Sequence, residues 1–367
     1  MKIGLITDSI ERGSPGIRRY VSHLAEEMLK LAPDSVTLLY RGSGTDPFYA
    51  GKPQQRIWSP RASFVGKQLL FRLQIHRRGF HVLHDTYHFP PFLVPGPYTK
   101  VMTIHDLTPL ILKSHTLRNR LAHRFYVRVL AHRADRVLTD SEHTRLDVIR
   151  LLGVNPDRVR AVPLAADESF RPVRDEERLQ NLRERYSLPD KFLLCLGTIE
   201  PRKNLARVLE AFGAIAGAFP ECALAVAGAQ GWGNVGLPQR AAELGFGPRV
   251  RFLGHVPEDD LAALYSAATA FVYPSLYEGF GLPPLEAMQC GCPVITSNVS
   301  SLPEVAGDAA LLVDPNSVEA IAGAMYDVLS NPSLRCQMQE KGLRQAGHFS
   351  WRRCAEQTLE AYEDARS

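Results

Sequence analysis

Short apolar runs alternate with amphipathic stretches in the first half of the chain. The first run, residues 2–7, is followed by Gly13-Ser14-Pro15-Gly16 and then by apolar residues at helical spacing from Ile17 to Leu31. This pattern predicts a strand, a glycine-containing loop and a helix, and further strands and helices follow. The other strands predicted in this half are 36–40, 81–84, 101–104, 136–139 and 159–162, and the other helices are 116–132 and 141–152.

The second half repeats this alternation after a turn-rich segment, 163–172, which we interpret as a linker. Strands that alternate with helices form parallel sheets, so the sequence predicts two α/β domains. Such domains bind ligands at the carboxyl ends of their strands, which predicts a site in a cleft between the two sheets. The strands predicted here are 192–197, 223–227, 250–252, 270–273, 293–296 and 310–313, with helices at 204–219 and 258–268.

The composition is that of a protein that folds throughout. The 367 residues are 45% hydrophobic and 22% charged, and the cysteines lie mostly in apolar contexts that predict buried side chains rather than disulfides or a zinc site. The longest uncharged runs, 222–239 and 261–277, contain glycines or polar residues, which disfavours membrane spans. Asp8 interrupts the first apolar segment too early for a signal peptide. We therefore expect a cytoplasmic protein.

Charge is distributed unevenly between the halves. Residues 1–170 contain 25 Lys and Arg against 15 Asp and Glu, whereas the remainder contains 18 against 24. The basic residues concentrate in two acid-poor stretches, 61–78 and 113–136. Such stretches are typical of surfaces that bind nucleic acid or anionic lipid, and also of solvated helix faces.

Two adjacent cations, Arg202 and Lys203, follow the first strand of the second half and precede a helix. Positive side chains beside the partial positive charge of a helix N-terminus suit a diphosphate. The sequence has no Asp-x-Asp element of the kind that holds a divalent metal on a diphosphate, and the acids at 258–260 are explained by a helix start. We therefore expect an anion site that works without a metal.

The strongest chemical signal is the segment 275–288, with the sequence SLYEGFGLPPLEAM. Glu278 closes a strand and loop, and Glu286 lies early in a helix that we expect to begin at one of the two prolines. The glycines between the two acids permit a tight turn near a ligand. Two carboxylates on the two sides of such a turn can bind different hydroxyls of one polyol.

The Glu278-x7-Glu286 element resembles that of retaining glycosyltransferases of family 4. These enzymes use nucleotide sugars and have the α/β GT-B fold, in which two Rossmann-like domains with parallel sheets face a central cleft. The resemblance implies an acceptor-side domain at 1–171, completed by a C-terminal helix at 350–367, and a nucleotide-sugar-binding domain at 172–349. Further similar segments are GTIEPRKN at 197–204, GHVP at 254–257, LYSAA at 264–268, GCPVI at 291–295, SLPEV at 301–305 and FSW at 349–351.

The resemblance implies roles for residues of the second domain. Glu286 would hold the nucleotide ribose, and Glu278 a hydroxyl of the donor sugar. Lys203 matches the family's diphosphate-binding lysine. The family's usual arginine, five residues earlier, is Thr198 here, and we expect Arg202 to replace it. The donor-binding segment would also include Gly279, Phe280, Gly281 and Leu282.

Four further residues are implied outside this core. The backbone around His255 and Val256 would contact the nucleotide base, and Gly16 would approach the diphosphate from the first domain. His105, at the end of a first-domain strand, would bind the transferred sugar or orient the acceptor rather than titrate as a base. Glu278, Lys203, Arg202 and His105 are the residues expected to act in catalysis.

The implied reaction transfers a hexosyl group to a hydroxyl of a glycan or lipid-linked glycan, with retained configuration. The segment 275–284 looks most like that of bacterial mannosyltransferases of surface-polysaccharide assembly, so GDP-mannose is the first donor to consider. No metal or other cofactor is expected. The basic half predicts peripheral contact with an anionic membrane at the inner face of the plasma membrane.

Two classes of alternative stay open. The same fold supports sucrose-type synthesis, phosphorolysis and nucleotide-sugar epimerisation. A non-catalytic binder of nucleic acid or anionic lipid would use the basic stretches alone, but no recognised nucleic-acid motif is present.

Overall fold

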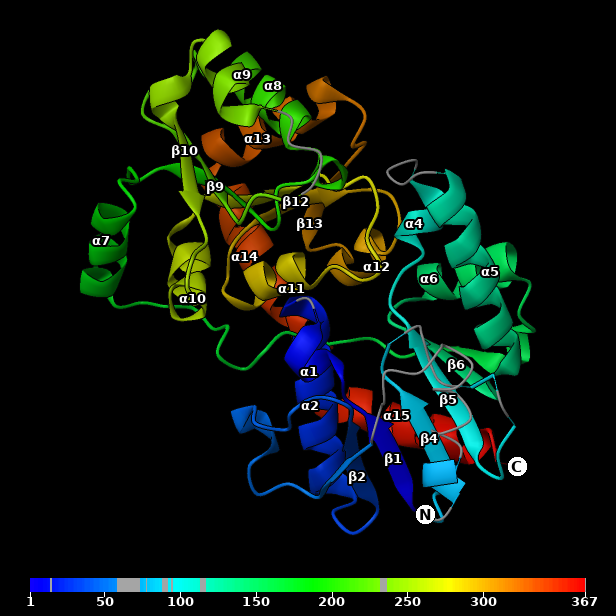
Figure 1. The fold of residues 1–367 in the computed structure, drawn as a ribbon. Helices are drawn as coiled ribbons and strands as arrows, with labels where there is room; N and C mark the ends of the chain where they lie inside the picture. Colours follow the sequence, from blue (N-terminus) through cyan, green and yellow to red (C-terminus); the bar gives the residue numbers. More distant parts are fainter. Residues whose placement is uncertain are drawn as a thin grey trace. The chain divides into compact units, whose positions relative to one another are not determined.

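The chain forms two compact units (Figure 1). The computed structural model describes residues 1–13, 15–57, 73–76, 78–87, 92–93, 95–112, 117–231 and 236–366, with the backbone alone at 12 and 117–123. Unit 1 is Met1–Leu164 together with Ser350–Ser367, and unit 2 is Ala165–Phe349. Each unit is built on a parallel sheet with helices on both faces, which confirms the predicted pair of Rossmann-like α/β domains.

A seven-stranded parallel sheet forms the centre of unit 1. Its strands are β1 (Ile3–Ile6), β2 (Val36–Tyr40), β3 (Gln54–Arg56), β4 (Val82–Asp85), β5 (Thr99–Ile104), β6 (Arg136–Thr139) and β7 (Val159–Ala161). Their order is β3-β2-β1-β4-β5-β6-β7. Strands β2 and β3 are therefore added on one side of β1, and strands β4 to β7 are added on its other side. The order reverses between β1 and β4, where Ile6 pairs with Asp85 at the carboxyl ends.

Helices cover both faces of this sheet. They are α1 (Ser9–Arg12), α2 (Pro15–Leu31), α4 (Thr108–Ile111), α5 (Leu117–Arg133), α6 (Glu142–Asp147) and α15 (Trp351–Asp364), with the short turns η1 (Pro47–Tyr49), η2 (Val148–Leu152) and η3 (Pro156–Arg158). On one face Val127 and Leu130 of α5 pack with Leu83 and Met102 of the strands. On the other face α2 packs against α15, which returns from the end of the chain (Figure 1).

A buried chain of polar groups ties α15 and α2 to the sheet. The Tyr362 hydroxyl lies 2.6 Å from His84 Nδ1, and His84 Nε2 lies 2.8 Å from Thr103 Oγ1. Thr103 Oγ1 in turn lies 2.9 Å from the Tyr20 hydroxyl. Burial, with a smaller contribution from His105, lowers the pKa of His84 to about 3, so its imidazole is neutral. These bonds satisfy polar groups that would otherwise be costly inside the fold.

Unit 2 contains a six-stranded parallel sheet. Its strands are β8 (Phe192–Leu196), β9 (Ala223–Ala227), β10 (Val250–Gly254), β11 (Ala270–Tyr273), β12 (Val294–Ser297) and β13 (Ala310–Val313). The order β10-β9-β8-β11-β12-β13 again reverses once, between β8 and β11. The loops that follow these two strands therefore diverge in direction at neighbouring points of one sheet edge, which is where α/β sheets bind ligands.

The core of unit 2 lies on both faces of its sheet. The helices are α7 (Glu176–Arg185), α8 (Leu205–Ile215), α9 (Leu237–Glu243), α10 (Glu258–Ala267), α11 (Leu282–Gln289), α12 (Leu302–Ala306), α13 (Val318–Ser330) and α14 (Pro332–Ala346), with the turns η4 (Pro201–Lys203) and η5 (Gly247–Arg249). One face packs α8, α9 and α13 against residues such as Leu193 and Val272. On the other face Tyr265 of α10 meets the Phe271 ring edge-on at 5.2 Å.

Two local predictions in unit 1 were wrong. The glycine loop predicted at 13–16 is shorter than expected, because Ser9–Arg12 form α1 and α2 already begins at Pro15, which places Gly16 inside a helix. The edge strand β3 was missed because Gln54–Arg56 contains no apolar residue and is held by pairing with β2 alone. Of the two basic stretches, 61–72, 77 and 113–116 lie outside the described residues.

We expect the Tyr362–His84 hydrogen bond to stabilise the folded state of unit 1. Tyr362→Phe removes the hydroxyl that faces His84 Nδ1 and should lower the free energy of unfolding by about 1–3 kcal/mol. Urea denaturation followed by circular dichroism measures the change. Tyr326→Phe on α13 is the matched control, because this side chain is exposed and should change stability by less than about 0.5 kcal/mol. Equal losses in the two variants would contradict the assignment.

Candidate functional site

The carboxyl edge of the unit 2 sheet brings together two segments that the sequence singled out. η4 follows β8 and carries Arg202 and Lys203, while the segment after β11 carries Glu278. The two are bonded to each other, because the Leu276 N–H donates to the Arg202 carbonyl at 2.9 Å, and Ser275 Oγ lies 3.1 Å from the same carbonyl oxygen. The reversal of strand order between β8 and β11 thus places both predicted segments at one point.

The Glu278 carboxylate lies at the centre of this cluster. Its Oε1 accepts hydrogen bonds from Lys203 Nζ at 2.8 Å, Ser275 Oγ at 2.6 Å and the Tyr273 hydroxyl at 2.9 Å. Its Oε2 accepts from Arg202 Nη1. Lys203 Nζ also contacts the Tyr273 hydroxyl and lies 4.6 Å from the centre of that ring. A carboxylate with this many donors is fixed in position before any ligand binds.

Electrostatics keep these groups charged although they are buried. Glu278 is 8% exposed. Burial alone would raise the pKa of its carboxyl, but the charges of Arg202 and Lys203 outweigh it and lower the pKa to about 2. Burial lowers the pKa of Lys203, and the Glu278 carboxylate opposes that shift. Burial, followed by the Glu278 charge, raises the pKa of Tyr273 well above its ordinary value, so Tyr273 remains a neutral donor.

Arg202 is held by two carboxylates. Its Nε and Nη2 donate to Glu200 Oε1 at 2.9 and 2.6 Å, and its Nη1 contacts Glu278 and donates to the Tyr277 carbonyl at 3.0 Å. Thr198, where the family pattern has arginine, is exposed. The guanidinium therefore orients Glu278 directly, in addition to whatever it offers an anionic ligand.

Backbone geometry also fixes this edge. Asn204 takes the left-handed conformation (φ 62°) and its amide donates to the carbonyls of Pro274 at 3.0 Å and Pro315 at 2.6 Å. Gly228, after β9, has φ 140°, and a Cβ there would lie 2.0 Å from the Gly197 carbonyl oxygen. Only glycine permits this approach of two backbones. The loops after four strands are thereby locked together at the N-terminus of α8.

Glu286 lies nearby on α11. The helix begins at Leu282, slightly before the prolines at which we expected it to start, and Gly281 precedes it with φ 127°. A Cβ at Gly281 would also approach Leu302 Cδ2 to 2.9 Å, so this turn requires glycine. Glu286 is 2% exposed, and its Oε2 accepts a hydrogen bond from the Tyr265 hydroxyl at 3.1 Å.

Packing and hydrogen bonds fix the segment between the two glutamates. Gly279 and Phe280 are buried, and the Phe280 ring meets Phe349 edge-on at 5.8 Å. Ser301 Oγ lies 3.0 Å from the Glu278 carbonyl oxygen and also contacts the Phe280 carbonyl. Further along the same edge, His255 is exposed and Val256 buried just after β10, which is separated from β8 by β9.

His105 and Gly16 belong to unit 1. His105 follows β5, and its Nδ1 lies 2.8 Å from Asp140 Oδ2 while its Nε2 lies 2.9 Å from the Thr86 carbonyl. Because a carbonyl only accepts, Nε2 carries a proton, and neither ring nitrogen is available as a base. Burial lowers the pKa of His105, but Asp140 outweighs it and the pKa is raised. Gly16 is exposed, and a Cβ there would meet no atom within 4 Å.

Several partners of these residues were not anticipated. Tyr273 and Ser275 contact Glu278, and Asp140 contacts His105. Tyr273 and Asp140 stand at or just after the end of an apolar strand, so the rule that chemistry gathers at carboxyl ends would have found them. Within the described residues, no group of three His, Cys, Asp or Glu side chains could hold a metal ion.

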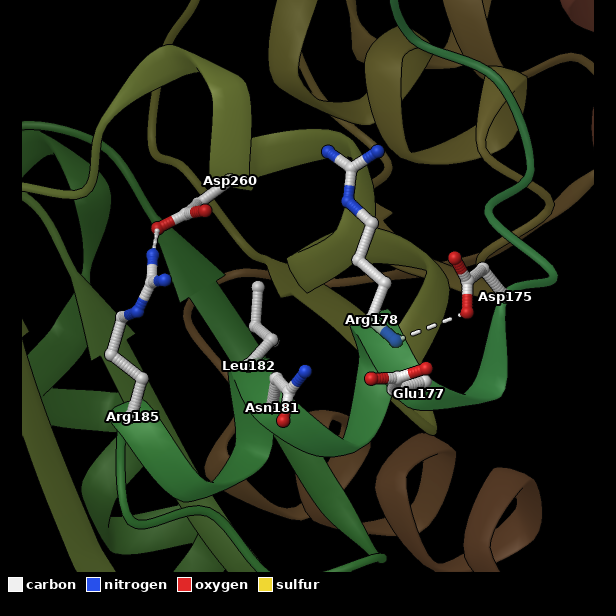
Figure 2. Close-up of a pocket in the computed structure, with 7 residues that line it drawn as sticks. All are labelled: Asp175, Glu177, Arg178, Asn181, Leu182, Arg185 and Asp260. Carbon is white, nitrogen blue, oxygen red and sulfur yellow. Dashed lines mark hydrogen bonds and ion pairs between the residues drawn. The ribbon is translucent and has the colours of Figure 1, made fainter.

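A cavity of about 420 Å³ lies away from this cluster, between α7 and α10 (Figure 2). Most of its charged side chains already bond within the protein: Arg185 Nη1 pairs with Asp260 Oδ2 at 2.8 Å, and Asp175 caps α7 by accepting from the Arg178 N–H at 3.2 Å. These are the interactions of helix ends and a surface ion pair, so we assign this cavity no role in the chemistry.

Comparisons with known proteins agree with the geometry. Residues 15–170 match the family model described as Glycosyltransferase Family 4, and residues 180–345 match Glycosyl transferases group 1. The chain is 35% identical to O-antigen chain mannosyltransferase B of Escherichia coli, over 99% of this chain and 100% of that protein.

Two solved structures share the fold. Sucrose-phosphate synthase from Thermosynechococcus elongatus has a TM-score of 0.77 at 23% identity and covers 99% of this chain and 98% of its own. HepE of Anabaena, in complex with UDP and glucose, has a TM-score of 0.77 at 18% identity and covers 98% of each chain. Because both units match and a relative aligns over its full length, the chain belongs to glycosyltransferase family 4, a family of retaining hexosyltransferases with the GT-B fold.

Proposed function

We propose that this glycosyltransferase moves a mannosyl group from GDP-mannose to a hydroxyl of a growing glycan, with retained configuration. The observation that carries the proposal is the 35% identity to O-antigen chain mannosyltransferase B over the whole length of both chains. A nucleoside diphosphate sugar as donor class is supported by HepE, which was solved with UDP and glucose. The buried carboxylates and cations at the edge of unit 2 suit such a donor.

Different groups at this edge would bind different parts of the donor. Glu286, buried in the first turns of α11, would accept from the ribose hydroxyls, and Glu278 from a hydroxyl of the sugar. The backbone from Gly279 to Leu282 would follow the donor between them. Lys203 and Arg202, with the N-terminus of α8, would hold the diphosphate. The backbone after β10, at His255 and Val256, would meet the base.

The reaction needs no protein nucleophile in this arrangement. The acceptor oxygen forms a bond to the anomeric carbon on the face from which the diphosphate departs, and the bond between that carbon and the diphosphate oxygen breaks. The acceptor proton moves to the departing phosphate oxygen. Lys203 and Arg202 stabilise the negative charge that develops there, which is where preorganised charge lowers a barrier most. His105 would not remove a substrate proton, since both its ring nitrogens have partners, and it would position a substrate hydroxyl by exchanging one of these partners.

The site of action follows from the proposed acceptor. An O-antigen-type glycan grows on a lipid carrier, so we propose a cytoplasmic enzyme that touches the membrane surface. None of the described helices combines the length and apolarity needed to cross a membrane. On α5, Phe125 is 66% and Tyr126 45% exposed, and Arg124 and Arg128 are exposed beside them. Aromatic and basic side chains together suit an anionic lipid surface.

A calorimetric panel of GDP, UDP and ADP and their sugars tests the donor. We expect GDP and GDP-mannose to bind more tightly than the others. Glu286→Gln should weaken GDP itself, because it removes a carboxylate assigned to the ribose. Glu278→Gln should keep GDP binding, since it frees Lys203 and Arg202 from their internal partner, but lose turnover with GDP-mannose.

Glu319→Gln, an exposed substitution on α13, is the control and should match the wild type in both measurements. Equal, near-wild-type kinetics in the Glu278 and Glu286 variants would refute the assignment. Formation of sugar phosphate, or of an epimer without acceptor, would point instead to phosphorolysis or epimerisation on the same fold.

Lys203→Ala tests how the diphosphate is neutralised. Turnover should fall at least about ten-fold, because a loss of even about 1.4 kcal/mol of transition-state stabilisation has that effect. Wild-type turnover should survive EDTA, since the proposed site uses side-chain cations and backbone dipoles. Lys191→Ala removes an exposed cation of the same unit and should have no effect. Loss of activity in EDTA that Mg²⁺ restores, with a harmless Lys203→Ala, would overturn this account.

Flotation with vesicles tests the membrane contact. Binding of the wild type should increase when phosphatidylglycerol is added to phosphatidylcholine vesicles. The double variant Arg124→Glu and Arg128→Glu should lose at least about ten-fold in partitioning, because each basic residue near the surface contributes about 1 kcal/mol. Arg344→Glu with Arg352→Glu gives the same net charge on α14 and α15 and should bind like the wild type. Binding that ignores anionic lipid would indicate a soluble acceptor.

A further inference from the structure

The Tyr273 hydroxyl lies between two charged groups that we assign to the donor. It donates to Glu278 Oε1 at 2.9 Å, and Lys203 Nζ contacts it while donating to the same Oε1 at 2.8 Å. An ammonium only donates and a carboxylate only accepts, so the hydroxyl accepts from Lys203 and directs its own proton to Glu278. The three polar atoms therefore form a closed triangle, in which one hydroxyl is bonded to both members of an ion pair.

The ring that carries this hydroxyl is fixed in the sheet. Tyr273 ends β11, is 4% exposed, and stacks on the Phe271 ring at 5.5 Å with 25° between the planes. Its carbonyl accepts from Thr296 Oγ1 at 2.9 Å on the paired strand β12. The hydroxyl is therefore held in place before a ligand binds, which is the kind of preorganisation that favours affinity.

The hydroxyl, rather than the ring, distinguishes this position from the rest of its strand. The other residues of β11, Ala270, Phe271 and Val272, are apolar and buried. A phenylalanine at 273 would fill the same space, whereas a buried hydroxyl costs free energy unless it is hydrogen-bonded. Here its partners are charged, and hydrogen bonds to charged groups are stronger than those between neutral groups. The oxygen atom thus makes interactions that packing alone does not require.

A bridge of this kind matters most when the ion pair opens. Under the proposed function, a diphosphate becomes the partner of Lys203, and Glu278 loses the ammonium as a donor. The tyrosine hydroxyl can keep both of its bonds during this exchange, since the sheet sets its position. We propose that Tyr273 is a positioning residue for the donor, whose hydroxyl holds Lys203 and Glu278 in place while the diphosphate separates them. The proposal rests on the donor roles proposed above for these two residues.

Tyr273→Phe tests the bridge, because it removes the oxygen and keeps the ring. In the free protein the Glu278 carboxylate would still have donors from three other side chains, but in the nucleotide complex it would also lose Lys203. The substitution should therefore destabilise the complex more than the free protein. We expect calorimetry with GDP to show at least about five-fold weaker binding, which corresponds to about 1 kcal/mol.

A double-mutant cycle separates this role from a purely structural one. Glu278→Gln removes the carboxylate charge, so adding Tyr273→Phe to it should change the affinity for GDP by less than about two-fold. An oxygen that only stabilised the fold would weaken binding equally with and without this charge. Tyr326→Phe is the matched control, since this exposed tyrosine lies on α13 of the same unit, and it should bind GDP like the wild type.

Thr296→Val keeps the proposal testable if Tyr273→Phe does not fold. It removes the hydroxyl that bonds to the Tyr273 carbonyl, while all three side chains of the triangle stay present. The affinity for GDP should fall in the same direction, by at least about two-fold, because the tyrosine is then less firmly preorganised. Circular dichroism and thermal unfolding show which variants are folded.

The proposal is overturned if folded Tyr273→Phe binds GDP like the wild type, or if it weakens binding equally with and without the Glu278 charge. It is also overturned if Tyr273→Phe does not fold and Thr296→Val binds like the wild type. If the panel above favours UDP or ADP, that nucleotide replaces GDP as the probe. A wild type that binds none of the three nucleotides would instead refute the proposed function, and this proposal with it.

Discussion

The ionised Glu278 carboxylate, buried among Lys203, Arg202, Tyr273 and Ser275, is the interaction on which the edge of unit 2 depends. A buried charge is tolerated only when it is paired and fully hydrogen-bonded, and removing one partner of such a pair typically costs about 3–5 kcal/mol. The need to satisfy this carboxylate therefore holds the loops after β8 and β11 in one arrangement. Asn204 and Ser301 extend the same constraint to the segments after β13 and β12.

The two sheets share a reversal of strand order but place different chemical groups beside it. Each sheet reverses its strand order once, and each gathers polar groups at the strand ends that flank the reversal. In unit 2 these groups are strongly charged, which suits a diphosphate. In unit 1 they are nearly balanced: Asp8 pairs with Arg41, Asp140 pairs with His105, and Asp85 has a pKa of about 7. The basic character of this half lies elsewhere, on helices such as α5, where Arg124 and Arg128 are exposed.

Sequence patterns predicted the parts of the molecule that local physics determines. The buried strands β8, β9 and β11 stood out because continuous apolar runs end at turn residues, and Glu278 and Glu286 stood out because of their glycine-rich surroundings. The edge strand β3 could not be predicted, since its polar residues are held only by pairing with β2. Asp140 stands just after an apolar strand, but its contact with His105 appears only when β5 and β6 become neighbours in the sheet. The pairing of Arg202 with Glu278, 76 residues away, was hidden for the same reason.

The charge balance of the unit 2 edge has a consequence for how the proposed donor is recognised. Arg202 and Lys203 carry two positive charges, and their partners Glu200 and Glu278 carry two negative ones, so the unliganded edge has no excess of positive charge. Under the proposed roles, a diphosphate would take the place of Glu278 as the partner of Lys203. The Glu278 carboxylate would then lose one of its donors, and a hydroxyl of the attached sugar would replace it. Under the proposed roles, recognition of the diphosphate and recognition of the sugar are therefore coupled through one ion pair, and a nucleoside diphosphate without its sugar leaves Glu278 unsatisfied.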